Sequence, residues 1–109
     1  MKLAILMVFF FSFFTSSKAL ADNNEISKAR KKEIFHIVKQ DCGSCHGMTL
    51  KGGLGTAILP EDLVNKPVEF LTYTIMNGRQ GTAMPPWKAI FNQSEANWIA
   101  QQLKQGTFK

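Results

Sequence analysis

The sequence has few of the side chains that usually cross-link small proteins or bind metal ions. Its 109 residues include two cysteines, Cys42 and Cys45, and two histidines, His36 and His46. A structural zinc site takes four such ligands, commonly as two separate pairs, and a second pair is absent. A thioredoxin-like redox pair belongs to a βαβ unit, but the chain shows no convincing strand pattern. If both cysteines serve another purpose, a structural disulfide is excluded too.

Long apolar runs are missing as well. The stretch from Leu3 to Phe14 is interrupted by Ser12, and it falls well short of the ~18–20 apolar residues that a membrane-spanning helix needs. A membrane anchor that stays attached is the alternative to a cleaved segment, and the run is too short for it.

The N-terminus has instead the three parts of a secretory signal peptide. Lys2 supplies the positive charge, the apolar stretch follows, and Ala19-Leu20-Ala21 has the small-x-small form of a cleavage site. We predict that residues 1–21 are a signal peptide cleaved before Asp22, and that residues 22–109 form the mature domain. We therefore expect the protein in the periplasm, without a stable membrane anchor.

The charge balance is mildly basic. The whole chain has 13 Lys and Arg against 8 Asp and Glu, and the expected mature chain keeps 11 and 8, a net charge of +3. Four basic residues near its start lack the interleaved aromatic side chains that stack on bases: Lys28, Arg30, Lys31 and Lys32. We therefore expect no nucleic-acid binding.

The two cysteines and the second histidine form one motif, Cys42-Gly43-Ser44-Cys45-His46. This C-x-x-C-H arrangement is typical of haem c attachment. Its two intervening residues let both sulfurs reach the two vinyl groups of one porphyrin, while His46 turns onto the iron. Bacteria attach haem c outside the cytoplasm, in agreement with the export signal. The sequence therefore predicts one covalent haem c, attached by the cytochrome c maturation machinery.

The expected mature chain is small, with 88 residues, and the signal segment removes five of the nine phenylalanines. An apolar core of this size is marginal, and small domains usually need a further stabilising group. A buried haem would supply it. We expect a single domain that acts as a monomer and that folds poorly without its haem.

Helical signals fill the rest of the chain, and we predict an all-α architecture. The pattern predicts a helix that Ser27 caps and that runs to about Gln40, a glycine-rich loop from Gly47 to Gly55 close to the porphyrin, a short helix from Pro60, a helix between Pro67 and Gly78, and a last helix that Ser94 caps. In the helix before Gly78, four residues are expected to face inward: Phe70, Leu71, Thr74 and Ile75.

The second axial ligand of the iron decides whether such a protein moves electrons or binds small molecules. Met48 is too close to His46 to reach the opposite face of the ring, Met76 lies inside a predicted helix, and His36 precedes the motif on the first helix. Met84 stands in a loop well beyond His46, and Pro85-Pro86 restricts its backbone. We expect Met84 to be the second ligand.

These residues resemble the class I monohaem cytochromes c, in which the haem motif is near the start and an axial methionine lies in a loop before the last helix. The resemblance covers Lys28 to Gly106. Two segments, Cys42 to Gly55 (CGSCHGMTLKGGLG) and Gly78 to Trp87 (GRQGTAMPPW), are similar to the small periplasmic cytochromes associated with cytochrome cd nitrite reductase.

The resemblance implies a small class I cytochrome c fold, with three to five short helices wrapped around one covalent haem c. It implies an electron carrier of denitrification, not an enzyme, that donates electrons to cytochrome cd nitrite reductase. A maturation or assembly factor for that enzyme's haem and a general periplasmic carrier to a terminal oxidase are the alternatives. A ligand sensor or enzyme would need an open distal face, and no distal base is evident.

One position departs from the family pattern. A proline often follows the G-G-L-G run in these cytochromes, where its carbonyl group can orient the proximal histidine, and this chain has Thr56 instead. The group that orients His46 therefore stays open.

Three basic residues lie in loops that flank a ligand or an attachment residue: Lys51, Arg79 and Lys88. We hypothesise that they surround the exposed haem edge and steer redox partner proteins. Ordinary solvated charges are the alternative. Arg79 has a second expected role, as a fork-shaped donor to a haem propionate.

Overall fold

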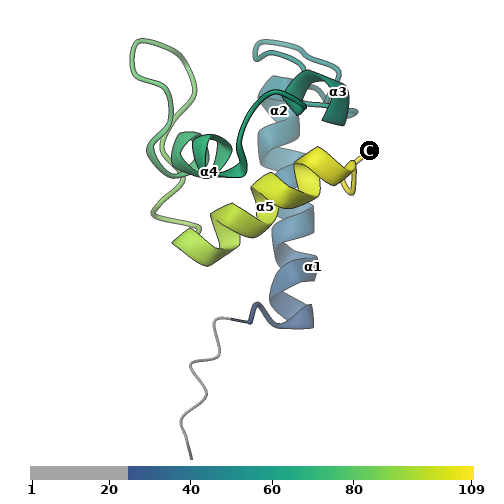
Figure 1. Cartoon of the computed structure of the whole chain (residues 1–109), viewed down its shortest axis with the longest axis vertical. Coiled ribbons are helices and arrows are strands. Elements are labelled where there is room, and N and C mark those ends of the chain that lie inside the picture. The colour runs from purple at the N-terminus through teal and green to yellow at the C-terminus, as the bar shows by residue number, and fades with distance from the viewer. Residues whose placement is uncertain (1–24) are drawn as a thin grey trace, which may run out of the picture.

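A computed structural model describes residues 25–109, and this part of the chain is helical without strands (Figure 1). Its elements are α1 (Lys28–Ile37), the π-helical turn η1 (Val38–Cys42), α2 (Gly43–His46), α3 (Pro60–Leu63), α4 (Val68–Asn77) and α5 (Gln93–Gln105). The predicted signal peptide and its cleavage point lie outside the described residues. Between residues 25 and 109, no helix is both long and apolar enough to cross a membrane.

The N-terminal helix is longer than the sequence suggested. Ser27 caps it as expected, because its hydroxyl oxygen accepts a hydrogen bond from the Arg30 amide at 3.2 Å. The helix does not end near Gln40, however. Its hydrogen bonds widen to the π pattern in η1 and then continue through α2, so the whole haem motif is helical. Gly47, with a φ of 89°, ends it.

The start of α5 also differs from the prediction, because Asn92 and not Ser94 is the N-cap. The Asn92 side-chain oxygen accepts a hydrogen bond from the Glu95 amide at 2.9 Å, and the Glu95 carboxylate accepts one from the Asn92 amide at 3.0 Å. This reciprocal capping box satisfies two free amides, whereas Ser94 lies inside the first turn.

The two proline-led helices lie where the sequence predicted them. Pro60 opens α3, and Pro67 and Gly78 flank α4. Phe70 is a partial exception, because half of its side chain is exposed although it was expected to face inward. Phe70 also lines the cavity described below.

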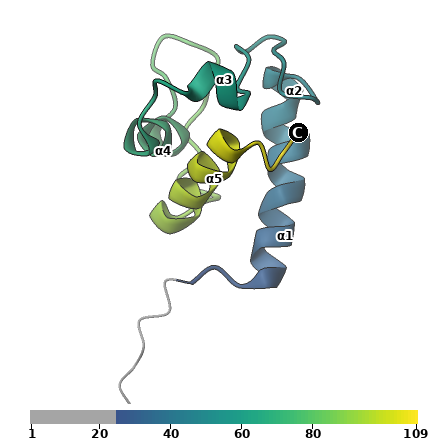
Figure 2. The ribbon, with the colours of Figure 1, turned by 45° about the vertical axis from the view of Figure 1, so that its right-hand side comes forward.

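The core lies between α5 and the N-terminal helix, which side-chain hydrogen bonds join, and α5 packs on its other side against α4 (Figure 2). The most deeply buried apolar side chains come from the N-terminal helix, from α5 and from the segments beside α5, and they include Ile34, Val38, Phe91, Ile99, Ala100 and Phe108. The Phe108 ring packs against Phe35, with ring centroids 5.4 Å apart. The Lys39 ammonium group donates hydrogen bonds to the carbonyl groups of Phe108 (2.9 Å) and Met48 (3.3 Å). The C-terminal segment is thereby held against the N-terminal helix.

Candidate functional site

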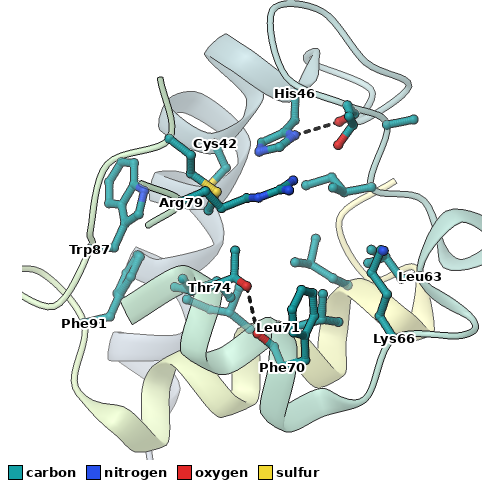
Figure 3. A pocket seen from close by; sticks show the side chains of 17 residues that line it. Cys42, His46, Leu63, Lys66, Phe70, Leu71, Thr74, Arg79, Trp87 and Phe91 are labelled. Carbon is teal, nitrogen blue, oxygen red and sulfur yellow. Dashed lines mark hydrogen bonds between the residues drawn. The ribbon is translucent and has the colours of Figure 1, made fainter. Parts of the chain in front are cut away.

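A cavity opens between the haem motif, α4 and the loop that follows α4 (Figure 3). This space, called the main cavity below, is partly open to solvent. Its walls are mostly apolar and include Ile58, Leu63, Phe70, Leu71, Ile75 and Trp87. An adjoining cavity lies against the motif and the Met84 loop, and the two share six residues: Cys42, His46, Thr56, Arg79, Met84 and Trp87.

His46 forms one wall of both cavities, with its ring directed into the open space (Figure 3). The ring Nδ1 lies 2.7 Å from the carbonyl oxygen of Thr56. A carbonyl group can only accept, so the neutral imidazole carries its proton on Nδ1 and leaves the Nε2 lone pair free for a metal ion. The carbonyl of Thr56 thus orients His46, and the family's proline is not needed for this contact.

The glycine-rich loop folds back over the haem motif and holds Thr56 in place. The amide of Gly52 donates to the carbonyl of His46 (2.8 Å), and that of Gly55 donates to the carbonyl of Cys45 (2.7 Å). A Cβ atom at Gly55 would lie 2.9 Å from both Nδ1 and Cε1 of His46. Only glycine allows this close approach, so the glycine-rich loop can pack directly against the His46 ring.

Cys42 and Cys45 are one helical turn apart, and neither forms a disulfide. Cys42 lines both cavities, and Cys45 lines the adjoining one. Burial, with a smaller effect of the Asp41 carboxylate, raises the pKa of the Cys42 thiol to about 11. The thiol is therefore protonated at neutral pH before a thioether bond forms.

Met84 is the one candidate for the second axial position that lines the cavities, and it lines both. His36 is exposed, Met76 lies in α4, and half of the Met48 side chain is exposed beside Gly43. None of these three lines either cavity. Of these four candidates, only Met84 therefore lines the same cavities as His46.

The loop that carries Met84 is held by its own hydrogen bonds. The Arg79 amide donates to the Met84 carbonyl at 3.2 Å, and the Thr82 hydroxyl donates to the Arg79 carbonyl at 2.6 Å. Gly78 has a φ of 66°, and a Cβ atom there would lie 2.6 Å from the Met84 carbonyl oxygen. The Trp87 amide donates to the Ile75 carbonyl at 3.0 Å and fastens the loop to α4.

The three basic residues expected around the haem edge, Lys51, Arg79 and Lys88, lie in different places. The Arg79 side chain extends into the main cavity, between His46 and the α4 side (Figure 3). Lys51 and Lys88 are exposed and line neither cavity.

The residues around the cavities fit a covalent haem. An imidazole whose free nitrogen faces the space, a thioether sulfur, two thiols at the edge and mostly apolar walls are the groups that such a cofactor requires. Arg79 crosses this space, and its long, flexible side chain would move aside for a planar ring.

Comparison with known proteins agrees with this chemistry. The family model described as cytochrome c oxidase, cbb3-type, subunit III matches residues 29–102. The chain belongs to this family of c-type cytochromes. The cytochrome therefore carries covalently bound haem c, has the small class I cytochrome c fold, and is an electron carrier like its relatives.

Named relatives of this cytochrome match over about two thirds or more of both chains. Cytochrome c55X of Pseudomonas aeruginosa is 44% identical over 87 residues, which cover 80% of this chain and 72% of the relative. Cytochrome c55X of Paracoccus denitrificans is 47% identical over 75 residues, covering 69% of this chain and 73% of the relative. Among solved structures, the c-type cytochrome NirC superposes with a TM-score of 0.74 at 42% identity, covering 76% of this chain and 98% of NirC.

A larger protein contains a similar region. The dihydro-heme d1 dehydrogenase NirN, solved in complex with DHE, matches with a TM-score of 0.60 at 28% identity. The match covers 64% of this chain but 15% of NirN.

Sequence reasoning missed two features of the site. The Thr56 contact uses a main-chain carbonyl, which leaves no signal in the residue type. Lys66 lines the main cavity, although in the sequence it is one lysine in a polar turn. Its position three residues after Leu63 and four before Phe70, both of which line the cavity, was the available signal.

Proposed function

We propose that this cytochrome is a periplasmic electron carrier that donates electrons to cytochrome cd nitrite reductase. In this proposal Cys42 and Cys45 form the two thioether bonds, and His46 and Met84 are the axial ligands. The position of Met84 on the cavities that His46 faces is the observation that carries the proposal. A closed coordination sphere favours electron transfer over ligand binding.

The chain's own residues each have a defined task in this function. Bound haem c takes up and releases one electron. The Thr56 carbonyl fixes the tautomer and the plane of the His46 ring, so that its orientation stays the same in both redox states. The Met84 loop supplies a thioether, and methionine ligation raises the reduction potential. The mostly apolar walls would limit the access of water to the haem.

The identity of the acceptor is supported by relatives and not by a contact. The match to NirC covers 98% of the NirC chain. The matches to cytochrome c55X of Pseudomonas aeruginosa and of Paracoccus denitrificans cover 80% and 69% of this chain. The expected signal peptide gives the compartment. The segments around the haem motif and around Met84 resemble the cytochromes associated with this reductase.

An absorption spectrum of the reduced protein, before and after carbon monoxide, tests the axial ligands. We expect a low-spin spectrum that carbon monoxide leaves unchanged. Met84→Ala should bind carbon monoxide, because it opens one face of the iron, while Met48→Ala should behave like the wild type. Rapid binding to the wild type would contradict a closed distal face.

Stopped-flow mixing of the reduced cytochrome with oxidised cytochrome cd nitrite reductase tests the acceptor. We expect a second-order oxidation of the cytochrome whose rate falls with ionic strength. Failure to transfer electrons to the reductase, together with rapid transfer to a terminal oxidase, would identify a general carrier instead.

The likeness to NirN favours a second candidate, a role in maturation of the reductase's haem. In that role the small cytochrome would exchange electrons with an enzyme that modifies the special haem. A strain lacking this protein would then contain reductase with an incomplete haem, whereas a strain lacking only an electron donor would contain complete reductase. Extraction and mass analysis of the haem from the reductase distinguishes the two.

A further inference from the structure

Lys66 is a second cation on the main cavity, in the turn between α3 and α4. Figure 3 shows its side chain beside Leu63, on the side of the cavity away from Cys42. Its ammonium nitrogen lies 5.8 Å from the centroid of the Phe70 ring, which also lines the cavity. The lysine is thus supported by an aromatic face and directed towards the cofactor space.

The main cavity offers its two cations no acidic partner. Both ion pairs found between residues 25 and 109 belong to Arg30, so neither Lys66 nor Arg79 is paired with a carboxylate there. The ionisable residues along the two cavities are Asp41, Cys42, Cys45, His46, Lys66 and Arg79, and Asp41 lines only the adjoining cavity. Both side chains are also exposed to solvent, and the cavity that they line is mostly apolar and contains no carboxylate of the protein.

Haem c brings two carboxylates of its own. Its propionates lie on the porphyrin edge opposite the vinyl-derived carbons that form the thioether bonds. With the ring attached at Cys42 and Cys45, the propionates would lie on the side away from the cysteines, and Figure 3 shows Lys66 on that side of the cavity. A carboxylate in apolar surroundings is costly unless it is paired and hydrogen-bonded.

We propose that Lys66 binds one haem propionate and that Arg79 binds the other. The sequence analysis expected the contact of Arg79, whereas the contact of Lys66 comes from the structure. The inference rests on haem attachment at Cys42 and Cys45, as in the proposed function, and is independent of the electron acceptor. Lys66 is then a positioning residue, which keeps the propionate ionised and the porphyrin edge in place.

Lys66→Gln tests this contact through the pH dependence of the reduction potential. An ionised propionate favours the oxidised iron, so the potential falls as the pH rises through the propionate pKa. An ammonium group within about 4–6 Å lowers a carboxyl pKa by about one unit or more. In Lys66→Gln we therefore expect this fall to move to higher pH by about one unit. Lys66→Arg should keep the wild-type profile.

Lys32→Gln is the matched control, because it removes the same charge from an exposed site on α1 and should leave the profile unchanged. An equal profile for Lys66→Gln and the wild type would overturn the proposal. In the reduced wild-type protein, we also expect proton NMR contacts between the Lys66 side chain and the propionate methylene groups. Their absence would overturn it even if the variant failed to fold.

The experiments also distinguish a failure of haem attachment, on which the proposed function rests, from a failure of the Lys66 contact alone. A mass spectrum of the wild type without covalent haem would overturn the attachment through the cysteines. A wild type with covalent haem, but with no change of profile in Lys66→Gln, would overturn the role of Lys66 alone. Neither measurement involves nitrite reductase.

Discussion

At the scale of single residues, His46 is held by main chain and not by side chains. Its Nδ1 meets the carbonyl oxygen of Thr56, and the missing side chain of Gly55 leaves room for the ring. The Thr56 side chain is exposed, and its hydroxyl group forms no hydrogen bond among the described residues. At Gly55 the absence of a side chain therefore matters, whereas at Thr56 only the main-chain carbonyl does.

We expect Thr56→Ala to leave the properties of the haem site unchanged. The variant keeps the carbonyl group that orients His46, so the reduction potential and the visible spectrum should equal those of the wild type. Potentiometric titration of both proteins checks this. A clear shift in potential would mean that the threonine hydroxyl contributes to the site.

Gly55→Ala is expected to disturb the same ring. The added Cβ atom would lie 2.9 Å from two ring atoms of His46, so the ring or the loop must move. Overpacking of this kind costs about 1–3 kcal/mol. Denaturant unfolding should show this loss in the free energy of unfolding, together with an altered visible spectrum.

Gly81→Ala is the control for that substitution. Gly81 has a φ of 75°, and a Cβ atom there meets nothing within 4 Å. Only conformational strain is expected, about 1–2 kcal/mol, with an unchanged spectrum. Equal spectra for the Gly55 and Gly81 variants would argue against steric control of His46.

At the scale of elements, an ion pair joins α1 to α5. The Arg30 guanidinium donates to the Glu95 carboxylate at 2.6 Å and 3.1 Å and also to the Ile90 carbonyl at 2.9 Å. Glu95 is 7% exposed and also caps α5. One carboxylate therefore fixes both the start of α5 and its position against the N-terminal helix.

Glu95→Gln should destabilise the protein. Hydrogen bonds to charged groups contribute about 1.5–3 kcal/mol, and we expect a loss of this size in the free energy of unfolding at neutral pH. Glu33→Gln is the matched control, because Glu33 pairs with the same arginine at an exposed site, where a pair contributes about 0–1 kcal/mol. Equal losses in the two variants would contradict the role of Glu95.

The same pair predicts a pH dependence. Hydrogen bonding from Arg30 lowers the pKa of Glu95 from its ordinary value of 4.5, so its contribution is complete above that pH and disappears as the pH falls through the lower, folded-state pKa. The free energy of unfolding of the wild type should therefore decrease in acid. Glu95→Gln should lack this part of the decrease when the two proteins are unfolded across the pH range.

Helix signals in the sequence were reliable where one residue type decides the backbone. Pro60, Pro67 and Gly78 bound their helices as predicted, and Ser27 caps the first. The errors arose where two polar residues compete to cap a helix, and where a helix continues through the haem motif. Asn92 displaces Ser94 because Glu95 returns its hydrogen bond, and the helix continues past Gln40 because nothing before Gly47 ends it. The haem motif was evident from its spacing, whereas contacts that depend on tertiary folding, such as that of Lys66, were not.

At the scale of the whole molecule, charge is expected to govern the encounter with the acceptor. The double variant Lys51→Gln/Lys88→Gln removes two exposed charges from loops near the haem site. We expect a several-fold lower association rate with the proposed acceptor, nitrite reductase, at low salt and a weaker salt dependence, with an unchanged reduction potential. Stopped-flow kinetics at several ionic strengths measures both.

Lys28→Gln/Lys32→Gln is the control for that experiment. It removes the same net charge from exposed positions on α1, far along the N-terminal helix from the haem motif (Figure 1). A specific docking surface predicts a smaller effect for this pair. Equal effects would mean that only the net charge steers association.

The burial of Phe108 has a consequence for the order in which the molecule is assembled. Its side chain is fully buried against Phe35, so the core joins residues from the two ends of the described chain. A chain that emerges N-terminus first exposes Cys42 and Cys45 well before Phe108 is available to close that core. Contacts so distant in sequence also form slowly. The thiols therefore remain accessible for a time, and thioether formation can precede the closing of the fold around them.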